Sequence, residues 1–284
     1  MKIVKNLKNL LIPFVFSGFF LAPPSYSQNL TFPRNTQEEV LPKKFETNLE
    51  KRIFDENPLQ NSKRDKYAVL ISGNSNQKYS QNLFLAYKTF IENGFKEENV
   101  YVLAPNGESP FPYPVDSHAS KKSIKILFDY LSKKVDSKDL LFIYTTGHGD
   151  TTKIKEKINA KLIFPEQEKF FAEEFIQSLK EIKPKEGILF SDQCYGGSFA
   201  KLAKEIGYTG ISASEEDKES WWNTFPQSFF RAWDKKTADK NNDGKLSLKE
   251  AFDYAKLHDF ISVGELQKPQ IFSKKDINKI FLKE

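Results

Sequence analysis

Two short stretches of this sequence combine a reactive side chain with glycine. The first, TTGHGD, places His148 between two glycines, and the second, SDQCYGG, contains Cys194, the only cysteine among 284 residues. A histidine beside a thiol can take its proton and so produce the thiolate, which is the nucleophilic form of cysteine. The same imidazole can later protonate a leaving amine. The two stretches therefore predict nucleophilic catalysis, with Cys194 as the nucleophile and His148 as the base.

Each of these residues taken alone has a simpler explanation. A lone cysteine is often a small buried hydrophobe, and a lone histidine can merely mark the end of a strand. Their joint occurrence, each after an apolar run and each beside glycines, favours the catalytic pair. Glycine lets the backbone approach a substrate closely, and amide groups beside the cysteine can hold a developing oxyanion.

Short apolar runs alternate with segments of helical periodicity along most of the chain. Strands are expected at 67–72, 100–103, 140–144, 188–190 and 208–213, with helices around 83–91, 124–131, 171–179 and 199–203. Strands separated by helices imply crossover connections and a mainly parallel sheet with helices on both faces. The two reactive stretches follow the third and fourth strands. We therefore expect them at the same edge of the sheet, where such folds bind their ligands.

The chain resembles the caspase-like cysteine peptidases, and within them the legumain (hemoglobinase-type) branch and its bacterial relatives. The similar passages, in the family's order, are AVLISGNSN, AYKTFIENGFKEENVYVL, LLFIYTTGHGD, GILFSDQCYGGSFA and YTGISASEEDKESW. A strand with His-Gly followed about 50 residues later by a strand with acid-x-Cys is a fairly specific combination. The resemblance implies an α/β fold, a three-layer α/β/α sandwich. It also implies an endopeptidase that acts through a thioester acyl-enzyme.

The resemblance also assigns roles to individual residues. It makes His148 the general base and Cys194 the nucleophile, and it makes the backbone amides of Gly149 and Cys194 the oxyanion hole. Family members carry an asparagine after the first strand that helps to position the histidine. Both Asn74 and Asn76 lie near that place in this sequence, and the spacing does not choose between them. The YGG after the cysteine differs from the usual x-Ser-Gly.

The pocket for the side chain before the scissile bond is assigned in the same way. In the resembling families, the acidic residue two positions before the cysteine helps to form that pocket, which makes Asp192 its counterpart here. Ser212 is expected near the substrate backbone. A buried carboxylate without a cationic partner costs several kcal/mol and favours a basic ligand. We therefore expect cleavage after Arg or Lys. Asn is the alternative, for which Lys78 would balance the charge of Asp192.

A second constellation lies downstream, in the twelve residues DKNNDGKLSLKE at 239–250. They match the EF-hand calcium loop at every diagnostic position, including glycine at the sixth. Hard Ca²⁺ prefers such oxygen ligands. The expected ligands are Asp239, Asn241, Asp243, the carbonyl of Lys245, Ser247 through a water, and Glu250 as a bidentate carboxylate. EF-hands usually pair and no second loop is found, so we expect structural calcium and no organic cofactor. The simpler explanation is an acidic turn that imitates the pattern.

The first 27 residues have the parts of a secretory signal peptide. Three lysines precede an apolar run at 10–22, and small residues at 25 and 27 provide a cleavage site before Gln28. The run is shorter than the roughly 20 residues that span a bilayer. We therefore expect a periplasmic or secreted protein without membrane contact after cleavage. The remaining chain is divided into a leader or wrapping segment at 28–64, a caspase-like peptidase core at 65–222 and a C-terminal helical part at 223–284.

Composition limits the partners that this protein can have. Loss of the three lysines in the signal peptide lowers the formal charge from +5 to +2. A nearly balanced charge argues against nucleic acid, because phosphate binding needs concentrated positive charge. The expected partner is a protein or peptide substrate, and the oligomeric state stays open. Two other functions remain: a catalytically inactive calcium-binding protein on a caspase-like scaffold, and a transpeptidase or ligase that uses the same dyad.

Overall fold

The computed structural model describes residues 49–53, 63–154, 157–221, 224–264 and 266–283. All of them belong to the unit formed by residues 41–284. The predicted signal peptide at 1–27 lies outside the described residues, as does most of the leader segment at 28–64, and both stay predictions. No helix within the described ranges is long and apolar enough to cross a membrane.

Seven strands form the central sheet, in the order β10-β9-β8-β4-β1-β2-β3. Their bounds are β1 (Lys66–Ser72), β2 (Val100–Ala104), β3 (Ser117–His118), β4 (Leu140–Thr146), β8 (Glu186–Ser191), β9 (Thr209–Ser212) and β10 (Gln270–Phe272). Neighbouring strands are parallel throughout, except that β10 runs antiparallel to β9. The predicted α/β class with a mainly parallel sheet is confirmed. The short edge strands β3 and β10 were not predicted.

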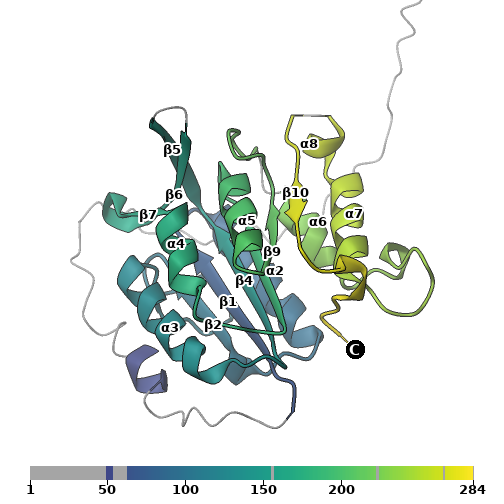
Figure 1. Cartoon of the computed structure of the whole chain (residues 1–284), viewed down its shortest axis with the longest axis horizontal. Helices are drawn as coiled ribbons and strands as arrows, with labels where there is room; N and C mark the ends of the chain where they lie inside the picture. The colour runs from purple at the N-terminus through teal and green to yellow at the C-terminus, as the bar shows by residue number, and fades with distance from the viewer. Residues whose placement is uncertain (1–48, 54–62, 155–156, 222–223, 265, 284) are drawn as a thin grey trace, which may run out of the picture. The chain divides into compact units, whose positions relative to one another are not determined.

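Helices cover both faces of this sheet (Figure 1). One face carries α3 (Lys121–Lys134), α4 (Ala172–Leu179) and α5 (Gly196–Glu205), and the other carries α2 (Gln77–Glu92), α6 (Thr224–Ala232) and α7 (Leu248–His258). Successive strand residues point to opposite faces. In β1, Val69 and Ile71 therefore join the first core while Ala68 and Leu70 join the second. This is the three-layer sandwich that the family resemblance implied.

Several helices begin where the sequence places a capping side chain. The side chain of Asn76 accepts a hydrogen bond from the amide of Lys78 at the start of α2. Ser120 caps α3 in the same way. Ser247 caps α7 and forms a reciprocal capping box with Glu250. Such caps satisfy amide groups that have no partner within the helix.

A second, smaller sheet separates β4 from α4, and the sequence did not predict it. Its strands are β5 (His148–Ile154), β6 (Lys157–Ile163) and β7 (Lys169–Phe171), all antiparallel. The chain passes from the large sheet to the small one at Gly147. Its φ of +132° is a conformation that favours glycine, and an added Cβ would lie 3.0 Å from the nitrogen of Gly73. His148 is thus the first residue of the second sheet.

The described part of the C-terminal segment 223–284 packs helices against one face of the central sheet and adds a strand to its edge. It contains α6, α7, the short α8 (Phe260–Val263) and β10. Gln270 of β10 pairs with Ser212 of β9. This segment therefore extends the central sheet as well as covering it.

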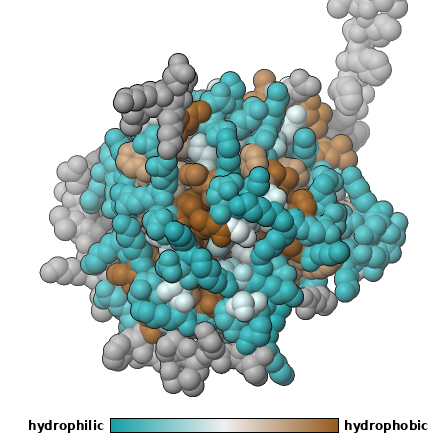
Figure 2. All heavy atoms as spheres, in the orientation of Figure 1, coloured by the Kyte–Doolittle hydropathy of each residue, from teal (hydrophilic) through white to brown (hydrophobic). Residues whose placement is uncertain are grey.

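The surface in view in Figure 2 is mostly hydrophilic, with smaller apolar patches between the polar side chains. Large exposed apolar side chains of the described residues are few, namely Trp221, Leu257, Phe260, Val263 and Leu266. They belong to α8, to the ends of the elements around it and to the segment before α6. The many Lys, Glu and Asp residues therefore form a solvated exterior.

Candidate active site

The segments that carry His148 and Cys194 meet at the carboxyl ends of β4 and β8. These two strands are neighbours, and Thr145 pairs with Ser191 close to their ends. A Cβ added to Gly149 would lie 2.1 Å from the carbonyl oxygen of Cys194 and 3.1 Å from its backbone nitrogen. Only glycine allows this close approach of the two backbones. The structure therefore brings the backbone next to His148 into contact with that of Cys194.

The imidazole of His148 is exposed and lies beside a small hollow. The ring of Tyr79, on α2, contacts it edge to face with the centroids 5.7 Å apart. Asn74 lines the same hollow, together with Gly73, Ser75, Pro105, Asn106 and the turn at 163–167. Asn76 does not line it and instead caps α2. Of the two asparagines considered, the structure places Asn74 beside His148.

The thiol of Cys194 is half-buried under the segment that follows β9. The backbone amide of Ser220 donates to its sulfur at 3.3 Å, and the thiol donates to the carbonyl oxygen of Ser220 at 3.7 Å. Burial raises the pKa of the Cys194 thiol; the bond from Ser220 opposes this, and the charges of Glu219 and Asp192 add to it. A thiol with a raised pKa is protonated at neutral pH, so its activation requires a base.

The turn after the thiol is shaped by two glycines, of which Gly196 stands where the resembling families usually carry serine. Tyr195 has a left-handed backbone (φ 60°), and α5 begins directly after it. A Cβ on Gly196 would lie 2.5 Å from the carbonyl oxygen of Ser191, and one on Gly197 would lie 2.5 Å from the nitrogen of Glu216. Both positions therefore require glycine. The N-terminal end of α5, which carries a partial positive charge, directly follows the turn that contains the thiol.

Asp192 is a buried carboxylate in which one oxygen accepts hydrogen bonds and the other has no hydrogen-bond donor among the described residues. Its Oδ2 accepts hydrogen bonds from the hydroxyls of Tyr144 (3.0 Å) and Thr146 (2.8 Å) and from the amide of Asn82 (3.4 Å). Its Oδ1 has no partner among the described residues. Burial raises the pKa of Asp192 to about 6, against the opposing effect of these donors and of the charge of Lys78. A buried acceptor without a donor is costly, so this oxygen is suited to a ligand.

Ser212 lies at the end of β9, where it is fully buried. Its hydroxyl donates to the carbonyl oxygen of Ser214 at 2.7 Å. Its expected place near the substrate backbone stays a prediction. The residue of this passage that contacts the thiol is Ser220. Ser220 and Tyr79 were both missed, because nothing in their side-chain types shows that one offers its backbone and the other its ring.

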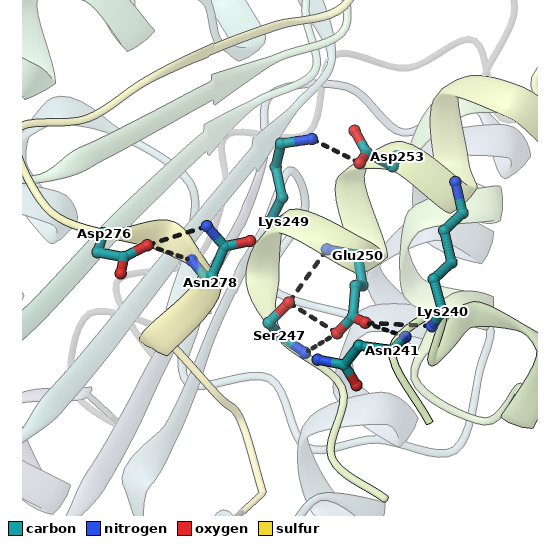
Figure 3. A network of polar contacts seen from close by, with 8 residues as sticks. All are labelled: Lys240, Asn241, Ser247, Lys249, Glu250, Asp253, Asp276 and Asn278. Carbon is teal, nitrogen blue, oxygen red and sulfur yellow. Dashed lines mark hydrogen bonds and ion pairs between the residues drawn. The ribbon is translucent and has the colours of Figure 1, made fainter. Parts of the chain in front are cut away.

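The predicted calcium loop lies between the 3₁₀ turn Lys236–Ala238 and α7. The Oε1 atom of Glu250 accepts from the backbone amides of Lys240 (3.1 Å) and Asn241 (3.3 Å), and Oε2 accepts from the amide of Ser247 (3.0 Å) (Figure 3). Burial raises the pKa of Glu250, but the hydrogen bonds from Ser247 and the loop amides outweigh it, so the pKa lies below its ordinary value. Glu250 is therefore an ionised side chain that closes the loop.

The other end of the loop supplies acceptors as well. The Oδ2 atom of Asp239 accepts from the amide of Gly244 at 2.9 Å, while its buried Oδ1 has no partner among the described residues. Gly244 has φ +80°, as the sharp turn at the sixth position requires. Asp243 accepts from the side chain of Asn241 and from the amide of Lys245.

No three His, Cys, Asp or Glu side chains gather closely enough in the described ranges to hold a metal by themselves. Asp239, Asp243 and Glu250, the acidic side chains among the predicted calcium ligands, therefore do not form such a group in this structure. The predicted ligands also include an asparagine side chain and a backbone carbonyl, which this criterion does not count. The unpaired oxygen of Asp239 and the acceptor-rich loop fit a hard cation. Calcium at this loop stays a prediction.

Comparison with known proteins supports the fold and the family. The chain is similar to the crystal structure of protein GSU0716 from Geobacter sulfurreducens, with 12% sequence identity and a TM-score of 0.52. The alignment covers 77% of this chain and 98% of that one. At this identity the likeness concerns the fold alone. No curated protein sequence matches the chain.

The family assignment comes from the sequence itself. The model of the peptidase C13 family matches residues 116–275, which is more than half of the chain and includes His148, Cys194 and the loop at 239–250. The chain therefore belongs to the peptidase C13 (legumain) family of caspase-like cysteine peptidases, whose substrates are proteins.

Proposed function

We propose that this protein is a cysteine endopeptidase in which His148 and Cys194 act as a catalytic dyad. The observation that carries the proposal is the contact of the Gly149 backbone with that of Cys194, which brings the segment that carries the exposed imidazole to the segment that carries the half-buried thiol. The pKa of this thiol is raised, so the thiol does not ionise at neutral pH without a base. The imidazole of His148 serves as that base.

The reaction follows from these positions. His148 takes the proton of the thiol, and the sulfur of Cys194 attacks the carbonyl carbon of the scissile peptide bond. The backbone amides of Gly149 and Cys194, whose backbones meet, stabilise the negative charge that develops on the carbonyl oxygen. The protonated His148 then donates its proton to the leaving amine. Water, deprotonated by the same imidazole, resolves the thioester and releases the acid product.

Asn74 is the asparagine that positions His148 in this proposal. It lies on the hollow beside the imidazole. Its amide nitrogen lies 3.4 Å from the hydroxyl of Ser72, and its side-chain oxygen accepts from the amide of Asn76 at 2.9 Å. These contacts hold the loop after β1 in place, which is what a positioning residue requires.

Cleavage after Arg or Lys is the specificity that the Asp192 pocket supports best. The free Oδ1 atom needs a donor, and the three groups that bind Oδ2 are all neutral. A cationic side chain would supply both the donor and the missing charge. Lys78 also acts on Asp192, and its charge would partly replace that of a substrate cation. Asn before the scissile bond is therefore the alternative.

Thiol labelling tests the enzymatic proposal directly. A peptidyl electrophile with Arg before its reactive group should modify Cys194 at least 100-fold faster than iodoacetamide does, because the site binds and orients it. Mass spectrometry locates the adduct without ambiguity, since the chain has only one cysteine. Cys194→Ala should abolish both labelling and peptide hydrolysis. Equal labelling rates with the two reagents, or hydrolysis by purified Cys194→Ala protein, would reject the proposal.

The alternatives give different results in the same assay. A transpeptidase would transfer the acyl group to an added amino-acid amide in preference to water, which a product analysis detects. A catalytically inactive calcium-binding protein would show slow labelling and no turnover.

We further propose that Ca²⁺ binds at 239–250 as a structural ion and that the protein is exported. The free carboxylate oxygen of Asp239 and the left-handed Gly244 support the calcium site. The three-part pattern at 1–27 supports export to the periplasm or the medium.

A further inference from the structure

Two buried polar side chains of the C-terminal segment have no role in the dyad. Gln267 is 3% exposed and Asp259 is completely buried. The Oε1 atom of Gln267 accepts from the backbone amide of Trp221 at 2.9 Å and from the hydroxyl of Ser220 at 3.5 Å. Its Nε2 atom donates to Asp259 at 3.0 Å. Gln267 therefore joins the segment that covers the thiol to the C-terminal part of the chain.

Asp259 determines which way the Gln267 amide faces. It caps α8 by accepting from the amides of Ile261 (3.3 Å) and Ser262 (3.2 Å), and it also accepts from the hydroxyl of Thr224. In each of these bonds a carboxylate oxygen of Asp259 is the acceptor. The –NH₂ group of Gln267 must therefore point to Asp259, which leaves its oxygen facing the Ser220–Trp221 backbone.

The segment that contains Ser220 and Trp221 also forms hydrogen bonds to the residues around the thiol. The amide of Ser220 donates to the sulfur of Cys194 at 3.3 Å. Two residues earlier, the carbonyl oxygen of Lys218 accepts from the amide of Tyr195 at 2.8 Å. The segment thus lies between the turn that holds the nucleophile and the amide of Gln267.

We infer that Gln267 is a positioning residue that holds the backbone N–H of Ser220 against the sulfur of Cys194. This inference rests on the proposed role of Cys194 as nucleophile. A hydrogen bond from an N–H group favours the thiolate over the thiol. Such a bond is directional and weakens steeply when it bends. A segment bound at Trp221 by a buried amide is held in the orientation that this bond needs.

Other ionisable groups also influence the pKa of the Cys194 thiol. The substitution of Gln267 that tests the inference leaves these groups unchanged. The titratable side chains that interact with the thiol are Glu219 on the covering segment, Asp192 after β8, Tyr79 on α2 and Tyr195 on the turn. His148, on β5, contacts the ring of Tyr79. A change at Gln267 removes none of these charges. Its effect on the thiol must pass through the segment.

The test is the pH dependence of Cys194 alkylation by iodoacetamide in Gln267→Leu, followed by mass spectrometry from pH 5 to pH 10.5. We expect the apparent pKa of the thiol to rise by about half a unit, which slows alkylation at pH 7 about threefold. The rate at the highest pH should not fall, because there the thiolate forms in both proteins. Gln270→Leu is the matched control, since within the described part of the chain the side chain of Gln270 bonds only to the carbonyl of Lys268.

Two outcomes would overturn the inference. An unchanged pH profile would show that the Ser220 amide does not depend on Gln267. A uniform change at every pH would show that Gln267 controls access to the thiol and not its ionisation. The same comparison in a His148→Ala background separates this inference from the dyad, because the shift should persist there even if His148 is not the base.

A measurement on the unmodified protein keeps the inference testable if Gln267→Leu does not fold. The amide proton of Ser220, followed by NMR, should titrate with the same apparent pKa as the alkylation of Cys194. This titration should disappear in Cys194→Ala. An amide signal of Ser220 that does not follow the thiol would overturn the inference.

Discussion

The edge of the sheet around Cys194 and the loop at 239–250 are built in opposite ways. The edge combines residues from α2, β5, the turn after β8 and the segment after β9, which are distant in the sequence. The loop consists of twelve consecutive residues whose hydrogen bonds join one to another. The first depends on the topology of the sheet, and the second depends mainly on local backbone geometry.

This difference determines how each region should respond to mutation. At the sheet edge, a change of one residue alters chemistry while the surrounding strands keep the fold. In the loop, a change should alter stability and metal affinity while the distant dyad keeps its geometry. A variant that changes both catalytic activity and calcium-dependent stability would show that the two regions are coupled.

The largest effect is expected from His148→Ala. Loss of the base should lower kcat/KM for peptide hydrolysis by about 10³-fold or more. The double variant with Cys194→Ala should be no worse than Cys194→Ala alone, because residues that act as a unit are not additive. Since the side chain of His148 is exposed, the melting temperature should barely change. Hydrolysis within tenfold of the unmodified protein would contradict the dyad.

A pair of glycine variants compares the two regions directly. In Gly149→Ala the new methyl group would meet the carbonyl of Cys194, and we expect about a 100-fold loss of kcat/KM. In Gly244→Ala nothing lies within 4 Å, so only the left-handed backbone is strained, at a cost of about 1 kcal/mol of stability. Hydrolysis at saturating calcium should be unchanged in Gly244→Ala. Activity assays and thermal unfolding in parallel check both expectations, and an inactive Gly244→Ala protein would show that the regions are coupled.

Calcium should stabilise the folded protein by mass action. At 100 times its dissociation constant, an ion that binds only the folded state adds about 2.7 kcal/mol. Glu250→Gln should remove most of this gain, because it deletes the bidentate charge. Differential scanning calorimetry of metal-free protein, with and without calcium, measures the effect. Identical melting curves under the two conditions would reject the site. Lys249→Gln serves as a control because the Lys249 side chain forms an ion pair with Asp253 and is not one of the predicted calcium ligands (Figure 3).

The smallest effect concerns the proposed role of Asp192 in substrate specificity. The pKa of this carboxyl is about 6, so it is ionised above that pH and neutral below it. The ratio of kcat/KM for an Arg peptide to that for a matched Asn peptide should fall about tenfold as the pH is lowered from 7 to 5. The ratio cancels the titration of the dyad. Asp192→Asn should make it independent of pH, and a ratio that already favours Asn at pH 7 would overturn the assignment to Arg or Lys.

The same carboxyl makes a contribution to stability that depends on pH. A group whose folded pKa lies above its unfolded value stabilises the protein most below the unfolded pKa. For Asp192 this contribution is lost as the pH rises from about 4 through about 6. The buried carboxylate is therefore retained at neutral pH at the expense of stability, which is consistent with a functional site.

The sequence by itself determined the features that depend on local patterns. Apolar runs predicted β1, β2, β4, β8 and β9, because strands covered on both faces are continuously apolar. The order of strands and helices predicted that the segments after β4 and β8 would share one edge. The spacing of oxygen ligands and glycine predicted the loop at 239–250, since that pattern needs only neighbouring residues.

Only the tertiary structure decided the contacts between distant backbones. In the sheet β5–β6–β7, β5 was missed because its residues are mostly polar, and β7 because it has only three residues. The strand β6 (KINAKLI) alternates polar and apolar residues over six positions, and this signal was overlooked. The choice of Asn74 over Asn76 depended on which one lies on the hollow beside His148. The bond from Ser220 to Cys194, held by Gln267, involves main-chain groups that every residue possesses. Residue types therefore cannot reveal such contacts, and the packing of the C-terminal segment against the sheet edge creates them.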